Sequence, residues 1–298
     1  MRWAGVLPAI TTPFREDGDI DHAALAAHVR WMLASGCDGI IPLGSLGEGS
    51  ALSFAEKEAV VRSCVAAAGD KPVVAAVAAA STREAVALAR MAEQSGCRGL
   101  MVLPPYVHSG DAREALAHVA AVLRSVRVDC MLYNNPIAYG ADFVPTLVQR
   151  LAKEHANLAA VKESSGDARR VTGIRALCGD RLAVFVGLDD MVVEGVAMGA
   201  MGWVAGLVNA LPEESVALFR LARKEPARAL DLYRWFLPLL RMDVVPDFVQ
   251  RIKLVQQVVG RGSERVRGPR LALEGAERAA ALALVEAALA ARPVLEKA

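Results

Sequence analysis

The fold of this chain is indicated most clearly by the stretch Leu158-Ala-Ala-Val-Lys162-Glu-Ser-Ser-Gly-Asp167. A short apolar run ends on a lysine, and a polar turn that contains Gly166 follows at once. Apolar runs of this length between turn signals are typical of strands in a parallel sheet that is covered on both faces. Lys162 therefore lies at the carboxyl end of a predicted strand, where parallel sheets and barrels carry their reacting groups.

The same unit of helix, buried strand and polar loop recurs along the chain. Two copies resemble each other directly, Ser35-Gly-Cys-Asp-Gly-Ile-Ile-Pro-Leu-Gly44 and Ser95-Gly-Cys-Arg-Gly-Leu-Met-Val-Leu-Pro104. Strands are predicted at residues 6–11, 39–43, 73–77, 99–103, 129–133, 158–162, 182–186 and 202–205. Helices are predicted between them at 21–34, 53–68, 82–94, 111–125 and 145–153, with Asp21, Ser53 and Ser81 as N-caps.

Eight such units with right-handed crossovers close most naturally into an α/β fold of the (β/α)8 TIM-barrel type. A doubly wound sheet is the alternative, but the units are uniform and no long break marks a switch point. After Lys224 the alternation stops, and three helices are predicted at 227–241, 246–259 and 271–291. We therefore expect a catalytic barrel over residues 1–225 and a C-terminal three-helix domain over residues 226–298. The first of these helices has an apolar surface to be buried on the barrel or another subunit: Leu232, Trp235, Phe236, Leu239 and Leu240.

The composition excludes several classes of protein. With 54% hydrophobic and 22% charged residues, the 298-residue chain can form a large core and is not of the disordered type. A net charge of +1 offers no electrostatic attraction for nucleic acid or an anionic membrane. Five scattered cysteines without a CxxC pair indicate free thiols in a reducing compartment. Because no apolar run suits a signal peptide or a membrane span, we expect a soluble cytoplasmic protein.

Lys162 is a candidate nucleophile. Lysine is scarce in this sequence, and the other six lysines lie in predicted helices, turns or the tail. A lysine that is removed from water can lose its proton, and its free amine attacks carbonyl carbon. The competing interpretation is a structural lysine whose side chain runs along the strand end to reach solvent.

Other predicted strands also end in polar residues. The second leads into Gly44-Ser-Leu-Gly-Glu48, whose glycines let backbone amides face a carboxylate while Ser45 offers a hydroxyl. The fifth ends at Tyr133, whose phenol can relay protons. Tyr106 follows the fourth strand and Gly187-Leu-Asp-Asp190 the seventh. An amine, a phenol, a hydroxyl and an amide nest at successive strand ends equip a site for imine formation with a 2-oxo acid.

In such a site the amide nest would hold the carboxylate while Lys162 forms a Schiff base with the adjacent carbonyl. The iminium withdraws electrons, and the phenol moves protons at C3 or to a leaving group. Competing chemistries lack their signatures: the five histidines show no HxH or HExxH spacing, and no GxGxxG or Walker loop is present. Asp189 and Asp190 are interpreted as the start of the next helix rather than as cation ligands. We therefore predict no metal and no cofactor besides the covalent Schiff base.

Along essentially its whole length the sequence resembles the dihydrodipicolinate synthase / N-acetylneuraminate lyase family. The matching motifs stand in order at strand ends: Thr11-Thr-Pro-Phe14, Gly44-Ser-Leu-Gly-Glu48, Pro104-Pro-Tyr106, Tyr133-Asn-Asn-Pro136 and Val161-Lys-Glu163. The resemblance implies a barrel with a C-terminal helical domain, usually assembled as a homotetramer. It also implies class I Schiff-base chemistry on pyruvate or a related small 2-oxo acid.

Carried over motif by motif, the resemblance implies three catalytic residues. Lys162 would be the Schiff-base lysine and Tyr133 the proton relay. Ser45 would support the tyrosine and bind the carboxylate beside the Leu46 amide. The predicted substrate-binding residues are Gly44, Leu46, Gly47, Tyr106, Gly187 and Val204.

Three departures from the family pattern bear on the substrate. Ala138 stands two residues after the YNxP proline, where the synthase has an arginine that binds a second substrate's carboxylate. Val107 replaces a tyrosine that completes a relay across a subunit interface, and Leu46 replaces the second threonine of GTTGE. Losing the arginine removes a bidentate anchor worth about 2 kcal/mol or more. We therefore predict that the chain is not a lysine-pathway synthase.

The stretch Tyr133-Asn-Asn-Pro-Ile-Ala-Tyr-Gly140 most resembles the catabolic branch of the family, which includes 1-pyrroline-4-hydroxy-2-carboxylate deaminase. We favour conversion of that imine to 2,5-dioxopentanoate: Lys162 captures C2, Tyr133 takes the C3 proton, the 4-hydroxyl leaves and hydrolysis releases ammonia. One alternative is a pyruvate-dependent aldolase of a 4-hydroxy-2-oxo acid, because both reactions diverge only after the enamine forms. Further alternatives are a dihydrodipicolinate synthase-like activity and, in another class, a non-catalytic 2-oxo acid binding protein.

Overall fold

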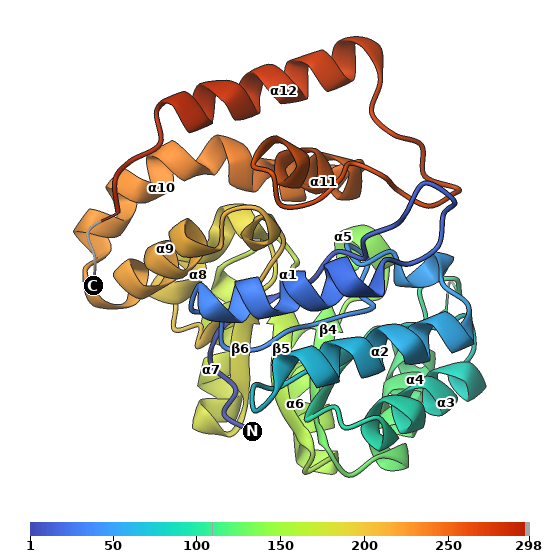
Figure 1. Cartoon of the computed structure of the whole chain (residues 1–298). Coiled ribbons are helices and arrows are strands. Elements are labelled where there is room, and N and C mark those ends of the chain that lie inside the picture. The colour runs from blue at the N-terminus through green and yellow to red at the C-terminus, as the bar shows by residue number, and fades with distance from the viewer. Residues whose placement is uncertain (109, 296–298) are drawn as a thin grey trace.

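The computed structural model describes residues 1–108 and 110–295 of the chain. In that part, parallel strands form a seven-stranded sheet in the order β1-β7-β6-β5-β4-β3-β2. The strands are β1 (Gly5–Pro8), β2 (Val74–Val77), β3 (Gly99–Val102), β4 (Asp129–Asn134), β5 (Leu158–Glu163), β6 (Ala183–Val186) and β7 (Gly202–Ala205). Helices wrap around the curled sheet (Figure 1).

The gap between β1 and β2 is closed by residues 39–43, which were predicted as the second strand. Ile41 forms a parallel bridge with Ala9, and Ile40 forms one with Val73. Further backbone hydrogen bonds accompany the bridges, such as that from the Ala76 amide to the Pro42 carbonyl. The segment does not form a regular ladder, because nearby prolines have no N–H to donate: Pro8, Pro42 and Pro72. The predicted (β/α)8 barrel is therefore confirmed, with its second strand reduced to two bridges.

The helices of the barrel begin where short polar side chains cap them. Asp21, Ser53 and Ser81 accept hydrogen bonds from first-turn amides, as predicted, and Asp111 does the same. A short helix directly after β4 was not predicted; it starts at Pro136 with Asn135 as its N-cap. The barrel helices are α1 (His22–Ala34), α2 (Phe54–Ala68), α3 (Thr82–Gln94), α4 (Ala112–Ser125), α5 (Pro136–Tyr139), α6 (Pro145–Glu154), α7 (Arg169–Cys178), α8 (Val192–Ala197) and α9 (Pro212–Lys224).

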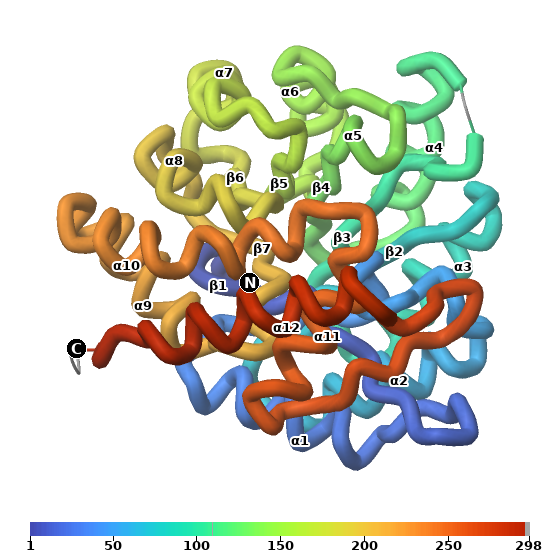
Figure 2. Tube along the Cα trace, turned by 90° about the horizontal axis from the view of Figure 1, so that it is seen from above, coloured from blue at the N-terminus to red at the C-terminus, as the bar shows by residue number. Residues whose placement is uncertain are grey.

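Three further helices, α10 (Pro226–Leu240), α11 (Phe248–Val258) and α12 (Gly275–Ala290), correspond to the predicted C-terminal helices. They lie across one end of the barrel, the end where α5 follows β4 (Figures 1 and 2). The apolar surface of α10 is buried within the same chain, since α10 packs on α8, α9 and α12. Trp235 stacks on Phe236 and donates a hydrogen bond to the carbonyl of Ala288 in α12. The division into two domains at residues 225 and 226 stays a prediction.

The strand register fixes which residues point into the barrel. Lys162 pairs with Phe185, and Phe185 pairs with Gly202, so these three residues share one face. Gly202 has no side chain, and the Phe185 ring fills that space: a Cβ there would lie 2.1 Å from the ring. Within the described residues, every helix is too short or too polar to span a bilayer.

Candidate active site

The site is organised around Lys162 and Tyr133, which are direct neighbours on β5 and β4. Paired residues of parallel strands project to the same face, here the interior of the barrel. The Lys162 Nζ atom lies 4.0 Å from the centroid of the Tyr133 ring. Only 6% of Lys162 is exposed. The structure thus brings the predicted nucleophile and the predicted proton relay into contact.

The amine of Lys162 has no hydrogen bond or ion pair within residues 1–108 and 110–295. Burial lowers the pKa of Lys162, and its electrostatic interactions with Tyr139, Asp243 and Asp189 only partly oppose that shift. A buried amine without a carboxylate partner gives up its proton more readily than a paired one. The electrostatics therefore suit a nucleophile.

Gly187 shapes the space that the lysine occupies. A Cβ at Gly187 would lie 2.7 Å from Lys162 Cε and 2.0 Å from Ser164 Oγ. Gly187, predicted to bind substrate, is therefore in contact with the lysine itself. Ser164 was not selected from the sequence, although it follows the strand directly. Its buried hydroxyl meets no partner in hydrogen-bond geometry among the described residues, but it lies beside the Tyr133 phenol, whose pKa it helps to lower.

The phenol of Tyr133 is held from its own strand end. The Asn135 amide donates a hydrogen bond of 3.1 Å to the Tyr133 hydroxyl. Burial raises the pKa of Tyr133, and the Asn135 hydrogen bond opposes that rise. Tyr133 is therefore protonated in the resting site and suited to give up or receive a proton only during reaction.

Ser45 contacts a different tyrosine from the one expected. Its hydroxyl lies 2.5 Å from the hydroxyl of Tyr139, and no hydrogen bond joins it to Tyr133 in the described chain. The Tyr139 ring packs edge-on against Tyr133 with centroids 5.6 Å apart, and lies 6.2 Å from Tyr106. Burial raises the pKa of Tyr139. Ser45 therefore does not contact Tyr133 as predicted, but binds Tyr139, which in turn packs against Tyr133.

Sequence reasoning missed Tyr139, although it lies in a stretch singled out for resemblance. The available sequence signal was the pattern of Asn135, Pro136 and Gly140, which is typical of the N-cap, first residue and C-cap of a short helix; Tyr139 ends that helix directly after β4. Such a helix turns the chain back over the strand end. The residue before Tyr139, Ala138, carries no charge to bind a second carboxylate.

The loop that joins residue 43 to residue 48 has an unusual backbone. Leu43 and Glu48 have φ angles of 67° and 53°, in the left-handed region that disfavours branched or long side chains. Glu48 is completely buried and receives hydrogen bonds from Lys253 Nζ, at 2.5 Å, and from the Arg267 amide. The C-terminal helices therefore hold the predicted carboxylate-binding loop in place.

The remaining predicted binding residues line the same end of the barrel. Gly47 cannot carry a side chain, because a Cβ would lie 2.8 Å from the carbonyl oxygen of Ile10, whereas a Cβ on Gly44 would only touch Met101 Cε at 3.9 Å. Leu46 is buried between these two glycines. Val204 is buried on β7, two residues beyond Gly202 and so on the inward face.

Two carboxylates at the site were not predicted to belong to it. Asp189 starts a 3₁₀ turn before α8, as its interpretation as a helix start implied. Its carboxylate, however, accepts hydrogen bonds from the Trp203 indole and the Gly206 and Leu207 amides, and burial raises its pKa to about 6. The other is Asp243, between α10 and α11. No local sequence pattern predicts that a residue of that turn lies at the carboxyl end of β7.

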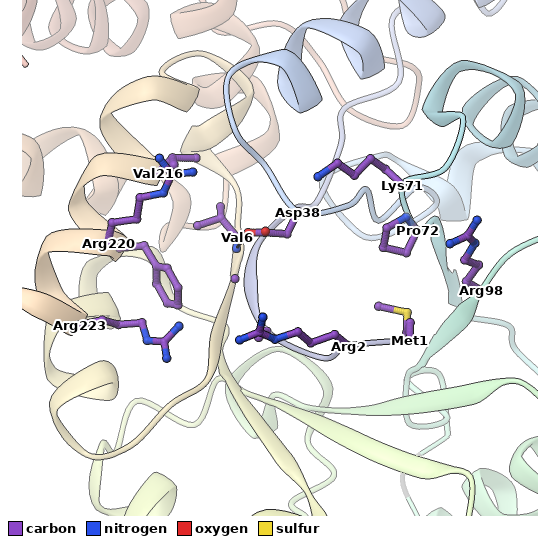
Figure 3. Close-up of a pocket in the computed structure, with 13 residues that line it drawn as sticks. Met1, Arg2, Val6, Asp38, Lys71, Pro72, Arg98, Val216, Arg220 and Arg223 are labelled. Atoms are coloured by element: carbon purple, nitrogen blue, oxygen red, sulfur yellow. Dashed lines mark hydrogen bonds between the residues drawn. The ribbon is translucent and has the colours of Figure 1, made fainter. Parts of the chain in front are cut away.

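A separate hollow of about 460 Å³ opens at the opposite end of the barrel, where β1, β2 and β3 begin. Figure 3 shows basic side chains around it, with Asp38 near Val6. These cations make no ion pairs in the described part of the chain: Arg2, Lys71, Arg98, Arg220 and Arg223. The hollow lies at the amino ends of the strands, whereas Lys162 lies at a carboxyl end. The two features are therefore distinct.

Comparison with known proteins agrees with this geometry. The dihydrodipicolinate synthetase family matches residues 2–288. A 4-hydroxy-tetrahydrodipicolinate synthase of Agrobacterium fabrum is 32% identical over 279 residues, which cover 93% of this chain and 95% of the relative. One from Acidobacterium capsulatum is 34% identical over 282 residues, 94% of this chain and 93% of the relative.

Solved structures share the fold. A putative dihydrodipicolinate synthetase from Pseudomonas aeruginosa has a TM-score of 0.90 and 30% identity, covering 96% of this chain and all of that chain (100%). YagE, a prophage protein of this family from E. coli K12 in complex with pyruvate, has a TM-score of 0.90, 27% identity, and covers 96% of this chain and 99% of that one. The two relatives named above are synthases. The comparisons therefore support a synthase-like Schiff-base enzyme and give no support to the pyrroline substrate.

Proposed function

The chain belongs to the dihydrodipicolinate synthetase family of lysine Schiff-base enzymes, and we propose that it acts on a small 2-oxo acid, or its cyclic imine, through Lys162. One observation carries this proposal: a buried amine without an ion pair lies 4.0 Å from the ring of a buried tyrosine, at the carboxyl end of β5. Burial lowers the pKa of this amine and so raises the fraction of free base.

In the proposed reaction the Lys162 amine attacks C2 of the substrate, and loss of water gives an iminium. Tyr133 donates its proton to the hydroxyl that leaves C2 as water, and so becomes a phenolate. The iminium withdraws electrons from C3, and the phenolate takes the C3 proton, which returns Tyr133 to the phenol. Tyr139 and Ser45, joined at 2.5 Å, would pass that proton onward. The substrate carboxylate would face the amides of residues 44–47 and the Ser164 hydroxyl. No cofactor is needed in this scheme, because the iminium itself serves as the electron sink.

After the enamine forms, we favour loss of a 4-hydroxyl, as in 1-pyrroline-4-hydroxy-2-carboxylate, over condensation with a second substrate. Ala138 supports this choice, because it offers no cation for a second carboxylate. The names of the relatives favour the synthase-like alternative instead. Release of pyruvate from a 4-hydroxy-2-oxo acid would identify the aldolase alternative, and dihydrodipicolinate formation from pyruvate and aspartate semialdehyde the synthase.

Borohydride trapping tests the proposal. The protein is incubated with pyruvate, 1-pyrroline-4-hydroxy-2-carboxylate or a 4-hydroxy-2-oxo acid, reduced, and analysed by peptide mass spectrometry. We expect an adduct on the peptide that contains Lys162 and none on Lys253, which is also buried but ion-paired. An adduct on neither lysine would refute the proposal and favour a non-catalytic 2-oxo acid binding protein if ligand still bound.

We also propose a cytoplasmic homotetramer. Val107 and Ile137 support subunit contact: they are 67% and 73% exposed, and they follow β3 and β4 at the same end of the barrel. Exposed apolar side chains in adjacent loops are typical of an interface. Light scattering should give about four times the monomer mass, and a monomer at micromolar concentration would refute this assembly.

A further inference from the structure

Asp243 lies at the mouth of the barrel, although it belongs to the C-terminal helices. It ends a 3₁₀ turn, Arg241–Asp243, between α10 and α11, and this turn packs against the turn that contains Asp189. A Cβ on Gly206, directly after β7, would lie 2.0 Å from Asp243 Oδ1. The carboxylate therefore rests against the carboxyl end of β7, in a space that only glycine leaves open.

The two neighbouring carboxylates differ in their hydrogen bonds. Asp189 is satisfied by the Trp203 indole and two backbone amides. The Oδ1 atom of Asp243 is buried and has no hydrogen-bond partner among the described residues. Buried polar atoms in folded proteins are nearly always paired, so an unpaired one at a reaction site indicates a partner that arrives with the ligand.

The groups that interact electrostatically with Asp243 belong to the proposed active site. Its charge interacts with that of Lys162 and raises the pKa of Tyr133 along with burial, so it lies near the two groups that are proposed to act on C2 and C3. Asp189 and Asp190 add further negative charge, and burial raises the pKa of Asp243. The positive charge at Lys162, an iminium once substrate is bound, opposes that rise and favours the carboxylate form of Asp243, which would repel a second carboxylate on the substrate and attract a hydrogen-bond donor.

We propose that Asp243 is a specificity-determining residue that accepts a hydrogen bond from a hydroxyl or protonated nitrogen on the substrate, beyond C2. This inference rests on the proposed Schiff-base function and narrows its substrate class. The substrate is a 2-oxo acid, or its cyclic imine, that carries a donor near C4 rather than a second carboxylate. Ala138 agrees with this class, because the mouth holds an acceptor on one side and no cation at position 138.

The test uses two matched pairs of compounds and borohydride trapping on the full-length protein. One pair is 4-hydroxy-2-oxopentanoate and 2-oxopentanoate; the other is 1-pyrroline-4-hydroxy-2-carboxylate and 1-pyrroline-2-carboxylate. The concentration that gives half-maximal adduct on Lys162 is measured at early times for each compound. We expect the half-maximal concentration for the hydroxylated member of each pair to be lower by a factor of about ten or more, as for a hydrogen bond to a charged acceptor.

Asp243→Asn should reduce this hydroxyl preference to about threefold or less, because the amide is a weaker acceptor than a carboxylate. Asp247→Asn is the matched control: Asp247 lies four residues further on, and its carboxylate pairs with Arg251. This control should keep the full preference. Both pyrrolines could instead be captured at lower concentration than both 2-oxopentanoates, whether or not they carry the hydroxyl. If Asp243→Asn removes that preference, the donor is the ring nitrogen.

Two results would overturn the inference: no preference in the wild-type protein for a hydroxyl or a ring nitrogen, or a preference that Asp243→Asn leaves unchanged. The wild-type measurement stands even if Asp243→Asn fails to fold. Failure of the proposed function looks different, since then no compound, pyruvate included, forms an adduct on Lys162.

Discussion

Two lysines of this chain are buried, and their surroundings differ. Lys162 is 6% exposed at the mouth of the barrel and has no ion pair in the part of the chain that the structure describes. Lys253, on α11, is 1% exposed; its Nζ donates hydrogen bonds to Glu48 at 2.5 Å and to the carbonyls of Thr12 and Arg265. Burial lowers the pKa of both, but at Lys253 the Glu48 carboxylate opposes the shift directly.

The difference indicates that pairing, rather than burial, distinguishes the proposed nucleophile from a structural lysine. The three acceptors of Lys253 fill its three donor positions, so its charge is compensated and its nitrogen is blocked. The amine of Lys162 meets only the face of Tyr133 and the more distant charges of Asp189 and Asp243. One lysine joins the C-terminal helices to the 43–48 loop, and the other is available to substrate.

The largest expected effect is on turnover in Lys162→Met. Removal of the nucleophile should lower kcat by about a thousandfold or more, as for members of other covalent catalytic units. The fold should remain, because the change removes a buried charge and keeps an apolar stem of similar length. Turnover on the trapped substrate and circular dichroism check this. Activity within tenfold of the wild type would mean that Lys162 is a structural residue after all.

Lys253→Met should instead destabilise the protein, by about 3–5 kcal/mol, because it leaves the buried Glu48 carboxylate without its partner. Denaturant unfolding measures this free energy. The exposed Lys71→Met is the control, with an expected change of about 0.5 kcal/mol or less. The double variant Lys253→Met/Glu48→Met should recover part of the loss. A cost for Lys253→Met no greater than that of the control would contradict a structural role.

A smaller effect is expected at the Ser45–Tyr139 hydrogen bond. Tyr139→Phe removes one hydroxyl of the proposed relay and should lower kcat by about tenfold to a hundredfold, at the low end for proton-transfer groups. Ser45→Ala in the same background should add little, because the two hydroxyls act as a unit. Kinetics of the wild type, both single variants and the double variant test this. Independent, multiplicative losses would show that the two residues do not share one role.

The smallest effect concerns stability and pH. The pKa of Lys162 is lower in the folded state than in the unfolded chain, so unfolding takes up a proton at any pH between the two values. The wild-type protein is therefore penalised below the folded pKa, and the penalty disappears as pH rises to the unfolded value. Lys162→Met should be more stable than the wild type at low pH, with the difference shrinking as pH rises. A difference that is constant across pH would show that packing, rather than charge, is responsible.

The sequence by itself determined the barrel and the central pair of the site. Apolar runs bounded by turn residues predicted the strands, and parallel strands bring their carboxyl ends to one side of a barrel. Lys162 and Tyr133 each stand at the end of such a run, so their meeting followed from topology. Helix starts such as Asp21 and Ser53 were also predictable, because a cap depends on neighbours within one turn.

Only the tertiary structure decided the rest. Ser45 and Tyr139 are 94 positions apart and Lys253 and Glu48 are 205 apart, so no local period relates them. The position of Asp243 depends on how the C-terminal helices dock on the barrel, and the closure at residues 39–43 depends on both edges of the sheet being present. The spacing of apolar residues along the sequence indicates which face of a helix or strand is buried. It does not record which distant polar group lies opposite, because that follows from packing the whole chain.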